Sequence, residues 1–369
     1  MVVNKSEILP IDKWFDIGNV KKPLLIAGPC SAETHEQILE IAKELAGLKN
    51  LCFFRAGLWK PRTRPNSFEG IGDVGINWLL EARKLYGVKI ITEVATPYHL
   101  EKILKANFDA IWIGARTTAN PFAIQQLSEA LKGVDIPVFV KNPINPDLEL
   151  WIGALERINK AGVKKIAAIH RGFSNYEKTQ YRNLPQWQIP IDLKTYIPEI
   201  TIFSDPSHIG GNSKYIFELS QEAMDLDFDG LMIEVHNNPN KALSDAFQQI
   251  TPDHLKEILN NIIIRDNDAK NNKVFVEIEE LRKKINILDD QLITVLEQRI
   301  RIVEKIGKLK KDNGITILQR ERWKKILSEA IKKASKKNIS TSFINKIFKL
   351  IHQEAIAVQA KIMNKKLHK

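Results

Sequence analysis

The stretch PLLIAGPCSAETHEQILEIAKELAGLKNLCFFRA, residues 23–56, contains the repeating unit that sets the fold. A short apolar run (23–28) leads through a polar turn into an amphipathic segment (35–48), and a second apolar run (51–56) follows. Short apolar runs separated by amphipathic helices are typical of parallel strands that are buried on both faces. The stretch therefore predicts a strand, a crossover helix and a second, parallel strand.

The same unit recurs as far as about residue 260. The candidate strands are 23–28, 51–56, 88–94, 109–114, 136–141, 164–169, 200–205 and 229–235. Eight β/α units in about 240 residues fit one closed (β/α)₈ TIM barrel, which typically needs about 250 residues. A doubly wound open sheet is the alternative that this pattern leaves open.

From residue 274 onward the pattern changes to an all-α one. Apolar residues step by three or four along 277–314, which indicates one long helix, and further helices are expected at about 320–335 and 342–363. We predict a barrel domain at 1–265, a linker at 266–273 and a three-helix domain at 274–369. Three such helices make a poor monomeric core, so we expect a homo-oligomer, a dimer through this domain or a tetramer.

Composition and charge narrow the class of protein. The 369 residues are 44% hydrophobic and 27% charged, no apolar run approaches a membrane span, and the N-terminus lacks a secretory signal. Only Cys30 and Cys52 are present, so a disulfide framework is not expected. We expect a cytoplasmic enzyme without a membrane partner, in which Cys52, in the middle of a strand, is a small core residue.

The basic charge is concentrated in the tail. Residues 271–369 carry 24 Lys and Arg against 11 Asp and Glu, whereas residues 1–270 carry 31 against 33. A basic domain suggests nucleic acid, but Trp323 is the only Trp of this tail, which has no Tyr and no helix-turn-helix spacing. We therefore expect no nucleic-acid partner.

Reactive side chains follow nearly every predicted strand, where a barrel places its active site. Six are cations: Arg55, Lys60, Arg62, Arg116, Lys141 and Arg171. Converging cations repel one another, so we expect two anionic substrates that carry phosphate or carboxylate groups. Four others, Cys30, His208, Glu234 and Asp245, combine soft and hard donors and predict a divalent metal site. Glu93 would orient either a cation or a water.

Several blocks of the barrel resemble 3-deoxy-D-arabino-heptulosonate-7-phosphate (DAHP) synthases. The blocks are AGPCS (27–31), FFRAGLWKPRTRPNSFEG (53–70), GAR (114–116), HRG (170–172), DPSHIGG (205–211) and EVHNNPNKALSDAFQQ (234–249). The related 3-deoxy-D-manno-octulosonate-8-phosphate synthases share the barrel but usually have a KANRSS-like loop, whereas this chain has KPRT at 60–63. The octulosonate activity is therefore the alternative.

The resemblance implies condensation of phosphoenolpyruvate with erythrose 4-phosphate, the first step of the shikimate pathway, with release of phosphate. It implies that Cys30, His208, Glu234 and Asp245 hold a divalent metal ion such as Mn, Fe, Co or Zn. Phosphoenolpyruvate would be bound by Arg55, Lys60, Arg116, Lys141 and Arg171. Lys60 would also be catalytic, as a proton donor, and erythrose 4-phosphate would be received by Pro61, Arg62 and Thr63.

The tail resembles the all-helical chorismate mutases, which convert chorismate to prephenate. The matching stretches are ELRKKINILDDQLITVLEQR (280–299), VEKIGKLK (303–310) and INKIFKLIHQEAIAVQ (344–359). By position, Arg282 (reaching across a dimer) and Arg299 would bind the substrate carboxylates, and Lys310 and Gln359 would be catalytic at the breaking ether bond. Gln319 and Arg322 would complete the site.

The tail departs from the mutase pattern at the second helix. The family's Asp-x-x-Arg-Glu pattern, whose acids contact the substrate hydroxyl, is replaced by a stretch with Gln319 for Asp and Trp323 for Glu, and Ala355 replaces a frequent Ser. A weakened mutase is expected, with a non-catalytic ligand-sensing or dimerisation module as the alternative. Because the barrel begins about twenty residues into the chain, we expect the tail to regulate it, with bound prephenate or chorismate as the inhibitor.

Overall fold

The computed structural model describes residues 7–14, 22–60, 67–176, 179–265 and 272–364. The chain divides into two compact units, Met1–Asn267 and Asp268–Lys369. No helix in the described ranges is both long and apolar enough to cross a membrane.

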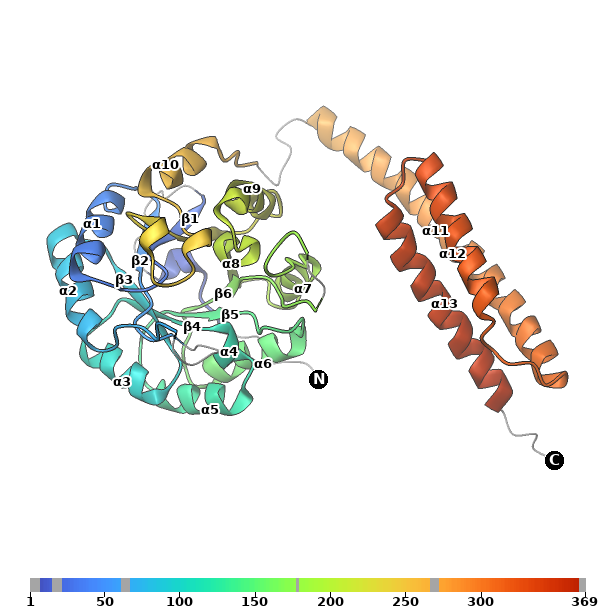
Figure 1. The fold of residues 1–369 in the computed structure, drawn as a ribbon, viewed down its shortest axis with the longest axis horizontal. Helices are drawn as coiled ribbons and strands as arrows, with labels where there is room; N and C mark the ends of the chain where they lie inside the picture. The colour runs from blue at the N-terminus through green and yellow to red at the C-terminus, as the bar shows by residue number, and fades with distance from the viewer. Residues whose placement is uncertain (1–6, 15–21, 61–66, 177–178, 266–271, 365–369) are drawn as a thin grey trace. The chain divides into compact units, whose positions relative to one another are not determined.

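The first unit is a closed barrel of parallel strands (Figure 1). In chain order the strands are β1 (Leu24–Gly28), β2 (Leu51–Arg55), β3 (Ile90–Val94), β4 (Ala110–Ile113), β5 (Val138–Lys141), β6 (Ile166–His170), β7 (Thr201–Ser204) and β8 (Gly230–Glu234). Pairing of β8 with β1, which sets Leu231 beside Leu25, closes the sheet. The predicted barrel is thus confirmed, and the open sheet is excluded.

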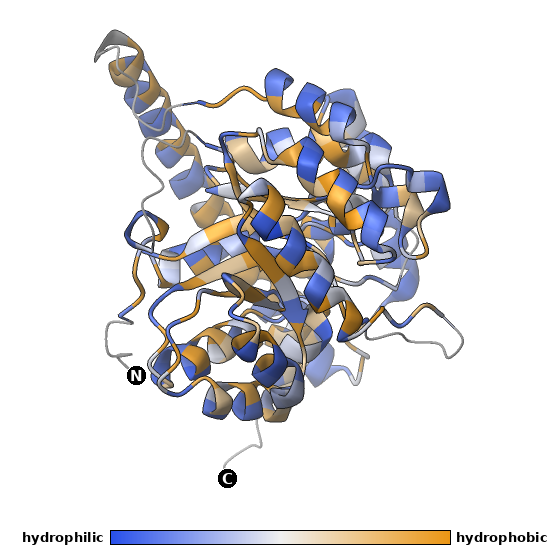
Figure 2. Cartoon of the chain, turned by 90° about the vertical axis from the view of Figure 1, so that its left-hand side faces the viewer, coloured by the Kyte–Doolittle hydropathy of each residue, from blue (hydrophilic) through white to orange (hydrophobic). Residues whose placement is uncertain are grey.

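Helices surround the strands. They are α1 (His35–Leu45), α2 (Val74–Tyr86), α3 (Pro97–Lys105), α4 (Ala115–Thr118), α5 (Pro121–Ala130), α6 (Leu148–Lys160), α7 (Gln188–Tyr196), α8 (Pro206–Gly210), α9 (Ile216–Asp225) and α10 (Pro252–Asn261). Several begin at a side chain that caps the first turn: Thr34, Thr96 and Thr251 each accept a hydrogen bond from the amide three residues on. In Figure 2 these helices carry both hydrophobic and hydrophilic residues, as helices that bury one face do.

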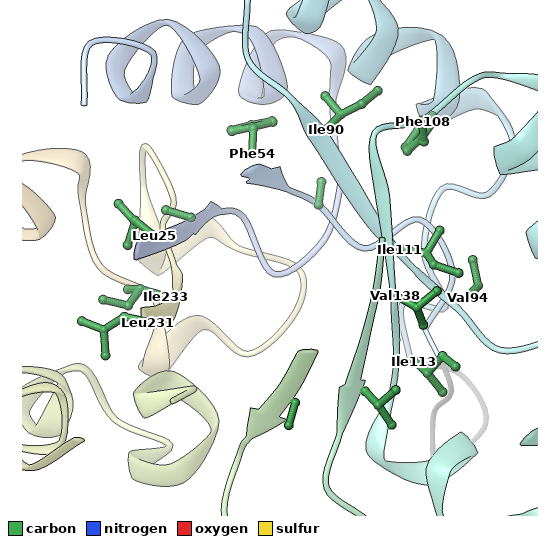
Figure 3. Close-up of a cluster of buried hydrophobic side chains, with 14 of the residues drawn as sticks. Leu25, Phe54, Ile90, Val94, Phe108, Ile111, Ile113, Val138, Leu231 and Ile233 are labelled. Carbon is green, nitrogen blue, oxygen red and sulfur yellow. The ribbon is translucent and has the colours of Figure 1, made fainter. Parts of the chain in front are cut away.

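The barrel has two apolar layers because neighbouring strand residues point to opposite faces. Leu25, Phe54 and Val138 point outward and pack in the layer between strands and helices (Figure 3). Ile26 belongs to the interior layer, which also holds Cys52, as predicted. The interior is a packed core, so polar groups that point inward gather at the carboxyl ends of the strands.

The second unit consists of α11 (Asn272–Asp312), α12 (Arg320–Lys336) and α13 (Thr341–Asn364). Helix α13 packs against both α11 and α12. Gly314, just beyond α11, has φ +65°, a left-handed conformation that suits the end of a helix. Large apolar side chains remain exposed along α11, among them Leu281, Ile285, Leu288 and Leu292.

Candidate active sites

The carboxyl ends of the barrel strands surround an open cavity of about 270 Å³. Its walls include Lys60, Glu93, Arg116, Lys141, Arg171, Arg182, His208 and Asp245. Four of the six predicted cations therefore lie on one cavity. Arg55 lies buried close by, and Pro61, Arg62 and Thr63, predicted to receive the second substrate, lie outside the described residues.

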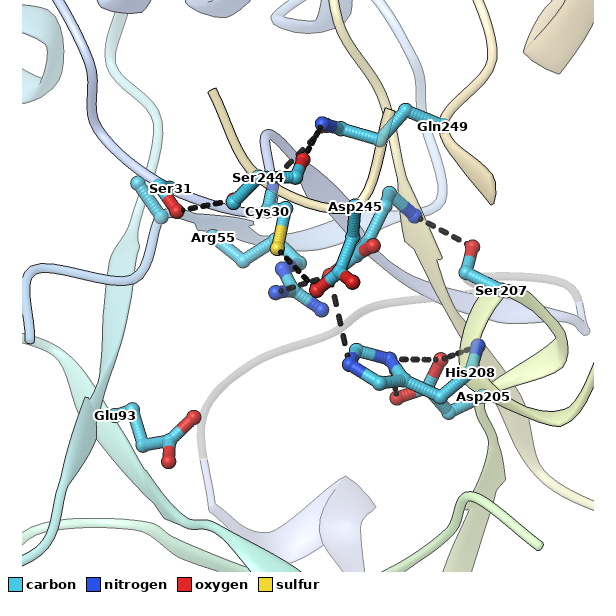
Figure 4. Close-up of polar contacts among 12 residues, drawn as sticks. Cys30, Ser31, Arg55, Glu93, Asp205, Ser207, His208, Ser244, Asp245 and Gln249 are labelled. Atoms are coloured by element: carbon cyan, nitrogen blue, oxygen red, sulfur yellow. Dashed lines mark hydrogen bonds and ion pairs between the residues drawn. The ribbon is translucent and has the colours of Figure 1, made fainter. Parts of the chain in front are cut away.

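The four predicted metal donors come together in two pairs. Cys30 Sγ lies 3.4 Å from Asp245 Oδ2, and His208 Nε2 lies 3.8 Å from Glu234 Oε1. Figure 4 shows the side chains of Cys30, Asp245 and His208 converging, whereas Glu93 lies apart from them. No group of three such donors in the described ranges has a ready-made metal-binding arrangement.

Cations stand beside three of these donors. Arg55 Nη2 lies 3.0 Å from Glu234 Oε1, and Lys60 Nζ lies 3.2 Å from Cys30 Sγ. Arg182 Nη1 lies 2.9 Å from Asp245 Oδ1. The negative charge that a metal ion would neutralise is therefore balanced by side chains of the chain itself.

Lys60 reaches this centre because the chain makes room for it. A Cβ atom at Gly57 would lie 2.7 Å from Lys60 Nζ, so a larger residue there would displace the lysine. Burial disfavours a charged Lys60, but the nearby Cys30 and Glu234 outweigh this and raise its pKa. Burial, together with Glu234, raises the pKa of Cys30 to about 12 in the absence of a metal. Lys60 is therefore protonated at neutral pH.

Asp205, at the end of β7, connects two of the predicted site residues. Its carboxylate lies 2.7 Å from Lys141 Nζ and 2.9 Å from His208 Nδ1. Burial favours protonated Asp205, but its interactions with His208 and Lys141 outweigh this and hold the pKa of Asp205 well below its usual value. With its proton on Nδ1, His208 donates to Asp205 and leaves Nε2 as a lone pair for a ligand.

Arg171, on the cavity wall, and Arg55, buried beside it, differ in their contacts. Burial lowers the pKa of Arg171 to about 10, and its buried Nη1 has no hydrogen-bond partner in the described part of the chain. The Arg55 guanidinium lies over the Trp112 ring, 4.9 Å from its centre.

Glu93 accepts a hydrogen bond from Trp112 Nε1 at 2.9 Å, and Gly114 gives it space, since a Cβ there would lie 2.2 Å from Glu93 Oε1. Glu93 thus binds the indole N–H of Trp112, a contact that was not among the expected roles of orienting a cation or a water.

Sequence reasoning missed two residues of this site, Arg182 and Gln248. Arg182 bridges Asp245 and Gln248, with Nη1 2.8 Å from Gln248 Oε1, and Gln248 Nε2 donates to Glu234 Oε2 at 2.7 Å. Arg182 lies in the loop between β6 and α7, twelve residues beyond the end of the strand. No signal at a strand end could have pointed to it.

The three-helix unit brings some of its predicted residues together. On α11, Arg299, Val303 and Gly307 share a face, and a Cβ at Gly307 would lie 3.2 Å from Gln359 Cγ on α13. Arg299 Nη1 and Gln359 Oε1 are buried without a hydrogen-bond partner in the described ranges. Lys310 Nζ donates to the Ile317 carbonyl at 2.6 Å.

The other predicted residues of this unit lie at its surface. Gln319 and Arg322 are exposed, and Arg282 is exposed and pairs with Glu279 at 2.6 Å. Trp323 stacks on His352, a residue that the sequence did not single out, with ring centres 4.0 Å apart. Arg282, Gln319 and Arg322 are therefore not buried with Arg299 Nη1 and Gln359 Oε1.

Comparison with known proteins matches both units to families. The DAHP synthetase I family matches residues 7–270, and chorismate mutase type II matches residues 281–360. A phospho-2-dehydro-3-deoxyheptonate aldolase of Thermotoga maritima is 35% identical over 258 residues, covering 69% of this chain and 74% of that protein. A 2-dehydro-3-deoxyphosphooctonate aldolase of Campylobacter jejuni is 27% identical, covering 69% of this chain and 100% of that protein.

The structural comparison agrees with these matches. A crystal structure of the Thermotoga maritima DAHP synthase covers 70% of this chain and 76% of that one, with a TM-score of 0.59 and 31% identity. The match to the family spans the barrel from η1 (Ile11–Lys13) to α10, including every strand end that carries a site residue. The chain belongs to the DAHP synthetase I family and carries a C-terminal chorismate mutase type II domain.

Proposed function

We propose that the barrel condenses phosphoenolpyruvate with erythrose 4-phosphate to DAHP and phosphate, and that the helical unit converts chorismate to prephenate. The observation that carries the first activity is the cationic cavity. Half-buried Arg171 has a buried Nη1 with no hydrogen-bond partner in the described residues, and exposed Arg116 adds a second guanidinium to the same wall. Two guanidinium groups on one cavity suit the phosphate and carboxylate of phosphoenolpyruvate.

The barrel donors fit a divalent metal ion, and we propose that Cys30, His208, Glu234 and Asp245 hold it. The fit rests on the two close donor pairs, on His208 Nε2 being available as a lone pair, and on a mixed set of sulfur, nitrogen and oxygen donors. When bound, such an ion supplies Lewis-acid polarisation of the aldehyde or activation of a water. Arg55, Lys60 and Arg182 would have to turn away from these donors to admit it.

The residues of the chain divide the remaining work. Arg116, Lys141 and Arg171 bind the anionic groups of phosphoenolpyruvate, and Asp205 holds Lys141 in position. Lys60, protonated and on the cavity wall, donates a proton to the alkoxide that forms on the aldehyde carbon. Pro61, Arg62 and Thr63 follow Lys60 in the chain and would receive erythrose 4-phosphate.

Substrate choice separates this proposal from the octulosonate alternative. The test is anaerobic incubation of the whole chain with phosphoenolpyruvate and either erythrose 4-phosphate or arabinose 5-phosphate, across Mn, Fe, Co and Zn. We expect phosphate release with erythrose 4-phosphate only, and its loss when EDTA is added. Turnover of arabinose 5-phosphate alone would overturn the substrate assignment, and full activity in EDTA would overturn the metal.

We propose that the helical unit acts as a dimer. Leu281, Ile285, Leu288 and Leu292 expose one apolar face of α11, and a second copy would cover it. Arg282 lies exposed on the same stretch and would reach the partner's pocket, where it would bind a second carboxylate beside Arg299. Sedimentation of the whole chain and of Leu288→Asp tests this, with dissociation expected for the variant.

We further propose that prephenate bound to the helical unit inhibits the barrel. Condensation is assayed with and without prephenate in the whole chain and in a chain ending at residue 270. We expect inhibition of the whole chain only. Equal inhibition of the shortened chain would contradict the proposal.

A further inference from the structure

A stacked aromatic pair lies in the helical unit, where the mutase pattern expects an acid. Trp323 on α12 and His352 on α13 have ring centres 4.0 Å apart and ring planes inclined by only 6°. Trp323 occupies the position of the family's Glu, whose carboxylate contacts the substrate hydroxyl. An indole N–H only donates hydrogen bonds. Trp323 therefore cannot accept a hydrogen bond from that hydroxyl, and Gln319, which replaces the family's other acid, is exposed at the surface.

His352 offers a suitable atom. Its Nε2 is buried and has no hydrogen-bond partner in the described part of the chain. On α13, His352, Ala355 and Gln359 follow each other by four or fewer residues and so share one face. Gln359 Oε1 on that face and Arg299 Nη1 on α11 are also buried and unpartnered in the described ranges. Because buried polar atoms normally have partners, these three atoms indicate a site for a polar ligand.

The surroundings keep the imidazole neutral. Burial lowers the pKa of His352, and the positive charge of Arg299 lowers it further. A neutral imidazole accepts a hydrogen bond at one nitrogen and donates at the other, so it can pair with a hydroxyl group. The Trp323 ring restrains the plane of the imidazole, which fixes the direction in which Nε2 points.

We propose that His352 binds the ring hydroxyl of chorismate and prephenate through Nε2, with Trp323 as the residue that positions it. This inference rests on the proposed mutase function. In that site Arg299 binds a carboxylate and Gln359 meets the ether oxygen, and His352 adds the contact to the hydroxyl. The polar group that binds the hydroxyl thus lies on α13, whereas the position of the family's Glu lies on α12.

The test measures binding of two ligands by titration calorimetry to the whole chain. The ligands are prephenate and an analogue in which hydrogen replaces the ring hydroxyl. His352→Phe keeps a ring to stack on Trp323 and removes both nitrogens, His352→Gln restores a polar group, and Trp323→Phe keeps the stack. Far-UV circular dichroism of each variant checks that the helices are intact.

We expect His352→Phe to weaken prephenate binding about tenfold, the size of one lost buried hydrogen bond, and to leave binding of the analogue within about twofold. His352→Gln should recover part of the loss, and Trp323→Phe should bind both ligands as the unaltered chain does. A purely structural role would weaken both ligands alike.

Contrary results would overturn either the contact between His352 and the hydroxyl or the mutase function itself. If His352→Phe weakens both ligands equally, or neither, His352 does not bind the hydroxyl. Should His352→Phe lose its helices, the comparison of His352→Gln with the unaltered chain decides: hydroxyl-dependent binding below that of the unaltered chain supports the contact, and the same loss for both ligands refutes it. If the unaltered chain neither binds prephenate nor converts chorismate, the proposed mutase function itself is wrong.

Discussion

The two units gather cations for anionic ligands in opposite ways. In the barrel, buried cations are matched to carboxylates of the same chain: Lys141 to Asp205 at 2.7 Å and Arg55 to Glu234 at 3.0 Å. In the helical unit, Arg299 has a buried nitrogen without a described hydrogen-bond partner, and burial is what lowers its pKa. The described cations of the barrel thus pair with carboxylates of the same chain, whereas the helical site, under the dimer proposed above, would be filled by a ligand and a second chain.

The difference follows from the architecture. A closed barrel directs the last inward side chain of every strand to one mouth, so residues more than two hundred positions apart, such as Cys30 and Asp245, meet. The three helices leave large apolar residues of α11 exposed, and in the proposed dimer a second copy would cover them. Single substitutions in the barrel site should therefore change condensation directly. Substitutions in the helical unit should change ligand binding and assembly.

The largest expected effect separates the two activities at Lys60. Lys60→Met removes the proposed proton donor, and we expect the kcat of condensation to fall by about 10²–10⁴, the usual contribution of a general acid. Chorismate conversion should be unchanged, because the two sites are built by different units. Lys132→Met, an exposed lysine of the barrel unit outside the cavity, is the control. A fall in both activities would contradict the independence of the two sites.

A smaller effect is expected at Arg299. Arg299→Met removes a charged hydrogen-bond donor from the pocket, and we expect kcat/KM for chorismate to fall by about 10- to 100-fold. Condensation without prephenate should be unaffected, and inhibition by prephenate should be lost.

Arg301→Met is the matched control for Arg299. Arg301 lies two residues along the same helix, is exposed and pairs with Glu297 at 2.6 Å. If both variants lower mutase activity alike, the effect is one of general charge, and the pocket assignment of Arg299 is wrong.

More of the barrel site than of the helical site could be predicted from the sequence, for physical reasons. Strand ends are fixed by the apolar pattern, so the positions of Lys141, His208 and Glu234 could be predicted. Arg182 could not be predicted, because it lies in a long loop. The periodicity of apolar residues does not show that this loop brings it to Asp245. In the helical unit a helix face can be predicted, but the stacking of Trp323 on His352 depends on how α12 and α13 pack.

The affinity of the barrel site for a metal ion should depend on Gln248. Gln248 donates to Glu234 and accepts from Arg182, so it orients one proposed ligand and restrains a competing cation. We expect Gln248→Leu to weaken binding of Mn about tenfold, as loss of a residue that supports a metal ligand does. Calorimetric titration measures this, with the exposed pair-forming Gln125→Leu as control. Tighter or unchanged binding would show that Gln248 does not position Glu234.

The smallest effect concerns the stability of the barrel in acid. His170 is buried among Trp151, Phe173, Trp187 and Phe228, and burial lowers its pKa to about 3. In the unfolded chain a histidine binds a proton near pH 6.5. Below that pH the unfolded chain holds one proton more than the folded barrel, so His170 makes stability fall as pH falls toward 3.

His170→Phe removes this proton uptake and keeps an aromatic ring among aromatic neighbours. The difference in unfolding free energy between the unaltered chain and the variant should be constant above pH 7. Below pH 6.5 it should shift in favour of the variant by about 1.4 kcal/mol per pH unit. Denaturant titrations followed by tryptophan fluorescence report mainly on the barrel, which holds six of the seven Trp. A difference independent of pH would mean that His170 is protonated alike in both states, and that the barrel admits charge at β6 more readily than its packing indicates.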